Sequence, residues 1–298
     1  MYMIVREFSL WLRCNKGYSK STIDNYYRTL IIFDDFLRTS TGGEGSVNLP
    51  HTIRLNDIDD FATYLEKKWK DAKTVNNYLY GIKSFLKFCK HKGLYVMDYD
   101  LICFQKEYDK KITALDWDKM KQLLHFMKND TSKSEILRIR DYAMALMLVY
   151  TGLRVSELIN LRVEDIQENI QVIGKWGSRR WVSLDPEYVK VVRLYLFLRK
   201  NIKSDFVFVS HSPNSYWNKI SRNSVENIIR AAGEKAGVGK VRPHKLRHTC
   251  ATQMLENGGN IVYISQILGH KNLKTTQGYL DYSNDKLRET QNLIPRVE

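Results

Sequence analysis

One stretch of the chain, Ile136–Tyr150, is apolar on almost every side of a helix. A helix without a polar face is stable only when other elements cover it, so this stretch predicts a buried helix at the centre of a domain. Its longest apolar run, Ala143–Tyr150, is far shorter than the ~20 residues that a membrane-spanning helix needs. We therefore expect a soluble protein that does not use a membrane as a partner.

The first hundred residues carry amphipathic segments that predict a small, all-helical domain. Apolar residues recur at helical spacing in each segment. The four predicted helices cover Met3–Arg13, residues 19–37, the region of Ile58–Leu65, and Thr74–Lys90. A charged stretch without periodicity, Gln105–Lys111, follows them and is expected to be a linker. The expected domains are therefore residues 1–104 and 112–298, joined by a linker over 105–111.

The second domain is expected to be mostly helical with one small β element. Asp116 and Ser224 can each cap the beginning of a helix. Two β-like runs, Ile170–Gly174 and Arg180–Leu184, flank a basic stretch and predict a β-hairpin with a basic turn. The predicted fold class is thus mainly α: an N-terminal four-helix domain followed by an α-rich domain with a small β-hairpin.

The charge of the chain favours a polyanionic partner. Its formal net charge is +14 and its pI about 9.4. Residues 1–110 contain 17 lysines and arginines against 14 acids, whereas residues 111–298 contain 30 against 19. Neutralising phosphates with such side chains releases counterions and supplies affinity for nucleic acid. Lysines of the first domain, such as Lys68, could face either DNA or only solvent. The four cysteines show no C-x-x-C spacing, which suits the reducing cytoplasm.

Polar side chains recur in otherwise amphipathic helical segments near the C-terminus. A proline in the first turn predicts a helix that presents His244 and Arg247 on one face. A second amphipathic run ends at Gly269, which leaves His270 at the end of that helix, and Tyr279 follows nine residues later. Consecutive short helices thus carry two histidines, an arginine and a tyrosine. This pattern indicates a functional site rather than part of the hydrophobic core.

A further arginine follows the buried helix. Arg154 is costly at this position unless it has a partner, and Glu157, three residues on, can hold its guanidinium. No metal site is expected, because a lysine replaces the glutamate of a zinc helix between His244 and His248, and Arg247 repels a cation. The remaining chemistry is metal-free phosphoryl transfer. Arginines would bind the non-bridging oxygens of a phosphodiester, and a tyrosine hydroxyl would attack it.

These residues resemble the motifs of a known family, the tyrosine recombinases of the phage-integrase and Xer type. The motifs follow the family's order and usual spacing over about 111–290, and the helical N-terminal unit is similar to the family's core-binding, SAM-like domain. The matching stretches are Thr-Gly-Leu-Arg154-Val-Ser-Glu-Leu, Gly-Lys175, Pro-His244-Lys-Leu-Arg247-His-Thr, Leu-Gly-His270-Lys and Thr-Thr-Gln-Gly-Tyr279. The resemblance implies a DNA-clamping domain followed by a catalytic domain, and a site-specific DNA recombinase that needs no metal, nucleotide or other cofactor.

The resemblance also implies a catalytic set with a role for each member. The tyrosine attacks the scissile phosphate to form a 3′-phosphotyrosyl intermediate, and the lysine protonates the departing 5′ oxygen. The two arginines bind the phosphate oxygens and stabilise the transition state. The first histidine assists proton transfer from the tyrosine, and the second positions or hydrogen-bonds the phosphate. The expected set is Arg154, Lys175, His244, Arg247, His270 and Tyr279.

Three members of this set have competitors in the sequence. Trp176 and Ser183 stand where the family often has glycine and proline, so an arginine at the start of the second β run competes with the lysine. A second tyrosine and a second histidine compete by their spacing. The competing residues are Arg179 or Arg180 for the lysine, Tyr282 for the tyrosine and His248 for the first histidine.

Two other functions share this chemistry or this fold. A type IB topoisomerase or telomere resolvase would use the same site without pairing two duplexes, and a catalytically silent relative would only bind DNA. For a recombinase the resemblance implies double-stranded DNA target sites, a homo-tetramer on two duplexes, and a C-terminal tail that docks on a neighbouring protomer. Chromosome-dimer resolution, mobile-element integration and inversion are all open as its role.

Overall fold

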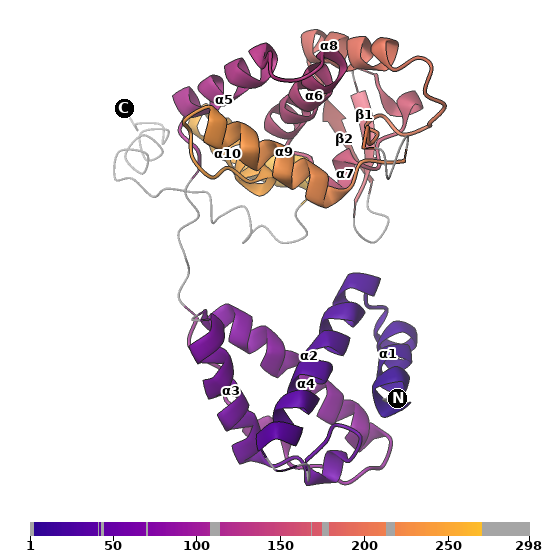
Figure 1. Ribbon diagram of the computed structural model, residues 1–298, viewed down its shortest axis with the longest axis vertical. Helices are drawn as coiled ribbons and strands as arrows, with labels where there is room; N and C mark the ends of the chain where they lie inside the picture. The colour runs from indigo at the N-terminus through magenta and orange to yellow at the C-terminus, as the bar shows by residue number, and fades with distance from the viewer. Residues whose placement is uncertain are drawn as a thin grey trace, which may run out of the picture. The chain divides into compact units, whose positions relative to one another are not determined.

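The chain folds into two compact units, Met1–Lys110 and Lys111–Glu298, each with its own hydrophobic core (Figure 1). This architecture comes from a computed structural model that describes residues 3–40, 42, 45–69, 71–107, 114–167, 169–174, 179–212 and 218–269. Helices dominate both units, and the strands of the described residues form one two-stranded sheet. The predicted fold class, mainly α with a small β-hairpin, is confirmed.

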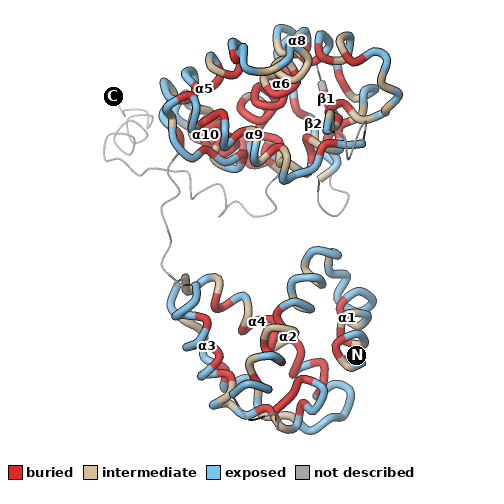
Figure 2. Tube along the Cα trace, viewed as in Figure 1, coloured by how far each residue is buried: buried red, intermediate tan, exposed pale blue. Residues whose placement is uncertain are grey.

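Each of the four helices predicted for the N-terminal unit is present. The helices are α1 (Met3–Lys16), α2 (Lys20–Ser40), α3 (Leu55–Trp69) and α4 (Ala72–His91), with short 3₁₀ turns η1 (Pro50–Thr52) and η2 (Tyr99–Leu101). Helix α4 packs against the other three, and buried residues line the inner side of each helix (Figure 2). Every helix contributes one fully buried phenylalanine to this core: Phe8, Phe33, Phe61 and Phe85. Apolar periodicity therefore identified both the helices and the faces that they bury.

A buried carboxylate fixes the connection that follows α2. Asp34 is fully buried and accepts hydrogen bonds from Val47 N at 2.8 Å, Ser46 Oγ at 2.7 Å and Arg38 Nε at 2.7 Å. A buried charge is tolerated only when donors surround it. The Asp34 network therefore holds the loop against the helix.

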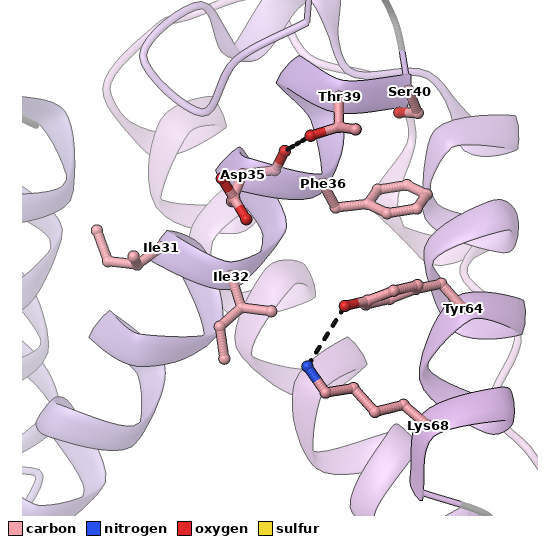
Figure 3. Close-up of a pocket in the computed structure, with 8 residues that line it drawn as sticks. All are labelled: Ile31, Ile32, Asp35, Phe36, Thr39, Ser40, Tyr64 and Lys68. Atoms are coloured by element: carbon pink, nitrogen blue, oxygen red, sulfur yellow. Dashed lines mark hydrogen bonds between the residues drawn. The ribbon is translucent and has the colours of Figure 1, made fainter.

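A groove between α2 and α3 shows how one basic side chain of this unit is used (Figure 3). The Lys68 ammonium donates a hydrogen bond to Tyr64 Oη at 3.3 Å. The same nitrogen lies 5.5 Å from the centre of the Tyr64 ring and 5.8 Å from that of Trp69. A cation over an aromatic face is attracted by the ring quadrupole. Lys68 is therefore held along α3 by its neighbours rather than extended away from the helix.

The C-terminal unit is built around α6 (Glu135–Thr151), as its all-apolar sequence predicts. Its residues from Ala143 to Val149 are all buried. Helices α5 (Trp117–Asn129), α8 (Pro186–Leu198) and α10 (Pro243–Glu256) pack against it. In Figure 1, α6 lies between α8 above it and α10 below it.

Four further helical elements lie in the described part of this unit: α7 (Val155–Leu158), η3 (Val163–Asp165), α9 (Arg222–Lys235) and α11 (Ile261–Leu268). The predicted cap of α5 is confirmed, because the Asp116 carboxylate accepts from Asp118 N at 2.9 Å. The predicted cap of α9 is wrong. The helix begins earlier, at Arg222, and its cap is Ser221, whose hydroxyl accepts from the backbone N–H of Ser224 at 3.0 Å. Ser224 occupies the third helical position, where its own N–H is the group that needs a cap.

The predicted β-hairpin is confirmed. Strands β1 (Asn169–Ile173) and β2 (Arg179–Ser183) are antiparallel, with Ile173 opposite Arg179 and Asn169 opposite Ser183. The turn over 175–178, with its expected catalytic lysine, lies outside the described residues. None of the described helices has the length and apolar character needed to cross a membrane.

Candidate active site

The first part of the site forms where α6 ends. Gly152 adopts a left-handed conformation with φ +61°, and a Cβ at this position would lie 2.6 Å from Leu268 Cδ2. Only glycine fits this turn without strain or collision. The turn delivers Arg154 to the start of α7, where the Glu157 carboxylate accepts from its backbone N–H at 2.8 Å and from its Nη1 at 3.0 Å. The predicted Arg154–Glu157 pair is thus confirmed.

The second part of the site comes from α10. A proline begins this helix, and His244 and Arg247 follow at a spacing that places them on one face. Arg247 is almost completely buried, with 2% of its surface exposed. Its guanidinium donates hydrogen bonds to the carbonyl oxygens of Gly152 and Leu268, the latter at 2.5 Å. These contacts join α10 to the turn after α6 and to the end of α11.

Three arginines meet at the C-terminal end of α11. Gly269 ends that helix in a left-handed conformation with φ +65°, as its sequence position predicts. The last carbonyl groups of a helix lack partners within the helix and carry its negative dipole end, so they attract cations. Each of the last three carbonyl oxygens accepts from a different arginine. The pairs are Ile267 with Arg180 Nε at 2.6 Å, Leu268 with Arg247 Nη2, and Gly269 with Arg154 Nη2 at 2.8 Å.

One carboxylate partly neutralises this cluster. Glu157 is buried, and Arg180 binds it through two hydrogen bonds, Nη1 to Oε1 at 2.9 Å and Nη2 to Oε2 at 2.7 Å. Burial alone would raise the pKa of the Glu157 carboxyl, but the hydrogen bonds from Arg180 and Arg154 and their charges lower it overall. Among the described residues, the cluster thus contains three guanidinium groups and one carboxylate that binds two of them. A phosphodiester is an anion that such an arrangement can bind.

The two histidines of α10 have different environments. His244 is exposed, and partial desolvation of its ring together with the charges of Arg247 and Arg154 lowers its pKa. Its ring is therefore neutral at pH 7 and can accept a proton. His248 is only 2% exposed, and burial lowers its pKa to about 4. His248 thus belongs to the packed side of the helix, whereas His244 remains accessible beside the arginines.

The described residues bring together Arg154, Arg247 and His244 from the expected catalytic set. Lys175, His270 and Tyr279 lie outside the described residues, as does the competing Tyr282. Within the described part of the chain, no group of three histidine, cysteine or acidic side chains is placed to hold a metal ion.

The sequence does not predict that Arg180 belongs to this cluster. Its position makes it a competitor for the lysine, whereas the structure shows all three of its guanidinium nitrogens engaged by Glu157 and Ile267. The strand pattern contained a signal, because Arg180 alternates with the exposed Arg179 and shares the inward side of β2 with buried Val182. An arginine on the buried side of a strand requires an acidic or carbonyl partner.

Comparisons with known proteins agree with this architecture. Residues 113–286 match the profile described as "Phage integrase family", and residues 5–93 match "Phage integrase, N-terminal SAM-like domain". A relative from Listeria innocua, "Tyrosine recombinase XerD", is 31% identical over 300 residues, which cover 96% of each chain. Among solved structures, XerA recombinase is 30% identical with a TM-score of 0.52 and covers 99% of both chains. XerH bound to difH substrate before cleavage shares the fold, with a TM-score of 0.75 at 18% identity over 99% of this chain and 85% of that one.

The two family matches correspond to the two units: the SAM-like domain to the N-terminal unit and the integrase domain to the C-terminal unit. The chain belongs to the phage integrase family. Its enzyme class is that of the tyrosine site-specific recombinases, so the resemblance predicted from the motifs is confirmed.

Proposed function

We propose that this chain cleaves and rejoins double-stranded DNA at two short target sites and exchanges strands between them through a phosphotyrosyl intermediate. The observation that carries the proposal is the arginine cluster at the end of α11. Arg154 and Arg247 donate to adjacent carbonyl oxygens there, and positive side chains outnumber negative ones among the described members of the cluster. Donors that are fixed before the substrate arrives stabilise developing negative charge without reorganising, which is the largest contribution in many enzymes.

In the proposed reaction the Tyr279 oxygen attacks the scissile phosphorus. A bond forms between phosphorus and the tyrosine oxygen, and the bond between phosphorus and the 5′ oxygen breaks. The 5′ oxygen leaves with a proton from Lys175, and the tyrosine proton passes toward His244. The phosphotyrosyl bond keeps the energy of the broken phosphodiester, so the reverse attack by a 5′ hydroxyl of the partner duplex completes the exchange without ATP or metal.

The binding groups of the site have separate tasks. Arg154 and Arg247 bind the non-bridging oxygens of the phosphate, and His270 adds a further hydrogen bond. The lowered pKa of His244 supports its role, because a neutral imidazole at pH 7 can take the tyrosine proton. The removal of one fixed donor from such a site costs on the order of 10²–10³ in rate.

The two units divide the work in this proposal. Residues 1–104 clamp the duplex, 105–111 link the units, and 112–298 cut and rejoin the strands. Four copies assemble on two duplexes, and the C-terminal tail of each copy docks on its neighbour. The excess of basic residues in 111–298 supports DNA binding. The structural neighbours support the substrate, since XerH is described in pre-cleavage and post-cleavage complexes with difH substrate and Tn1549 integrase in complex with transposon right end DNA. We propose chromosome partition in the cytoplasm as its role; the relatives named "Tyrosine recombinase XerD" support the recombinase activity on which that role depends.

The nucleophile is tested by trapping the covalent intermediate on a nicked DNA substrate. Cleavage beside the nick releases a short fragment, so religation fails and the adduct accumulates. The wild-type protein and Tyr282→Phe are expected to form the adduct, whereas Tyr279→Phe is expected to bind the DNA without forming it. An adduct in Tyr279→Phe but not in Tyr282→Phe would transfer the role to Tyr282. No adduct from the wild-type protein would indicate a DNA-binding relative without catalysis.

A second assay separates recombination from relaxation. A plasmid with two target sites should give recombinant products, and a supercoiled plasmid with one site should remain largely supercoiled. Efficient relaxation of the one-site plasmid without recombination of the two-site plasmid would instead indicate a topoisomerase or resolvase activity.

A further inference from the structure

Arg180 stands at the junction of three elements of the catalytic unit. It lies on the inward side of β2, and only 10% of its side chain is exposed. Its Nε donates to Ile267 O at 2.6 Å, while Nη1 and Nη2 both bind the Glu157 carboxylate. One guanidinium therefore connects β2 with α7 and with the end of α11.

Arg180 lies against the two groups that anchor the Arg154 guanidinium, the Glu157 carboxylate and the end of α11. Glu157 accepts from Arg154 through the backbone N–H at 2.8 Å and through Nη1 at 3.0 Å. The carbonyl of Gly269 accepts from Arg154 Nη2 at 2.8 Å, and a Cβ on Gly269 would lie only 3.0 Å from Arg180 Nη1. Arg180 thus binds one anchor of the Arg154 guanidinium, Glu157, and lies beside the other, Gly269.

The shared carboxylate also determines how far the positive charge of Arg154 is offset by a negative one. Both oxygens of Glu157 already accept from Arg180, so Arg154 adds a single side-chain hydrogen bond to one of them. Without Arg180, a buried and unneutralised carboxylate would draw Arg154 into a two-point pair of its own. That pair would occupy the donors and cancel the charge that a phosphate needs.

We propose that Arg180 is a positioning residue for strand cleavage: by neutralising Glu157 and holding the end of α11, it keeps the Arg154 guanidinium available to the scissile phosphate. This inference rests on the proposed role of Arg154 as a phosphate ligand. Arg180 neither contacts the DNA nor supplies a proton. Its three guanidinium nitrogens are already engaged by Glu157 and by the carbonyl of Ile267.

The test measures single-turnover cleavage and DNA affinity separately for Arg180→Met. We expect the cleavage rate constant to fall by about 10²-fold, the loss that follows disruption of one fixed donor. The dissociation constant for DNA at fixed salt should change by only a few-fold. Arg193→Met is the matched control, because it removes the same charge from an exposed position on α8 of the same unit. A loss in Arg193→Met equal to that in Arg180→Met would overturn the assignment.

A second substitution separates positioning from a merely structural role. Glu157→Gln in the Arg180→Met background removes the negative charge that would trap Arg154. The double variant should therefore cleave about tenfold faster than Arg180→Met alone, within the range of coupling between contacting residues. If Arg180 only stabilised the fold, losing a second buried group would slow cleavage further. A double variant no faster than the single one would refute the proposal.

A modified substrate tests the competing role as proton donor. Replacing the bridging 5′ oxygen by sulfur gives a leaving group that needs no proton. This substrate should restore cleavage to Lys175→Ala but not to Arg180→Met. Restoration in Arg180→Met would overturn the proposal and make Arg180 the donor. Covalent adduct formation by the wild-type protein is scored in the same assay, so a failure of the proposed function is distinguished from a failure of this inference.

Discussion

The buried imidazole of His248 should make the C-terminal unit sensitive to mild acid. Its ring is 2% exposed within α10, with Nδ1 3.4 Å from Thr252 Oγ1. Burial, reinforced by nearby His244, lowers its pKa from 6.5 to about 4. A histidine in the unfolded chain titrates near 6.5. The unfolded state therefore binds more protons than the folded state between these two values, and stability falls as the pH drops below 6.5.

The size of this loss follows from the two pKa values. One pKa unit corresponds to about 1.4 kcal/mol, so His248 should lower the free energy of unfolding by about 2 kcal/mol at pH 5 and about 3 kcal/mol at pH 4. At pH 7.5 its contribution is close to zero. A loss of this size is a large fraction of the stability of an ordinary domain.

Hydrogen exchange of the buried α10 amides measures this loss in the C-terminal unit itself, because protection reports the free energy of opening. The fall in opening free energy between pH 7.5 and pH 5 should be about 2 kcal/mol smaller in His248→Asn than in the wild-type protein. His125→Asn, at an exposed position on α5, is the control for the loss of a histidine. An equal fall in the wild-type protein and His248→Asn would refute the reasoning.

Three further predictions concern the turn after α6, the N-terminal unit and the site histidine. Gly152→Ala should cost about 2–4 kcal/mol in urea unfolding, because its Cβ meets Leu268 in a left-handed turn. Gly93→Ala, left-handed but with open space around it, should cost only about 1–2 kcal/mol. Asp34→Asn should destabilise the N-terminal unit by about 2–3 kcal/mol, since three donors lose a charged acceptor; unchanged denaturation midpoints would contradict this. DNA should raise the lowered pKa of His244 in a proton NMR titration of Tyr279→Phe, because a phosphate offsets the arginine charges, and binding should tighten as the pH falls. An unchanged pKa on binding would place the phosphate elsewhere.

Local chemistry was enough to predict most helices and several of their ends. Asp116 caps α5, a proline begins α10 and Gly269 ends α11, because each acts on backbone groups within a few residues. The all-apolar sequence of α6 similarly identified the centre of the C-terminal unit. The misplaced cap of α9 shows the limit of this approach. Two serines three residues apart satisfy the same local rule, and only the backbone decides which of them begins the helix.

The contacts that organise the site could not be derived in the same way. The two carbonyl groups that Arg247 binds lie 95 and 21 residues away in the sequence, and Arg180 finds its carboxylate 23 residues away. Local spacing predicted the pair between Arg154 and Glu157 because these residues are three apart. It could not indicate that a third arginine shares the same carboxylate, since that depends on how β2 packs against α7 and α11.

The attachment of three arginines to three successive carbonyl groups restricts the length of α11. Every residue added to a helix advances its end by 1.5 Å and turns it by about 100°. An insertion between Ile261 and Leu268 would rotate Ile267 O, Leu268 O and Gly269 O away from their donors together. The loop before the helix, residues 257–260, is exposed, and the contacts given for it are local ones such as the cap that Asn260 provides for α11. Relatives should therefore vary in length before this helix and keep its residue count unchanged.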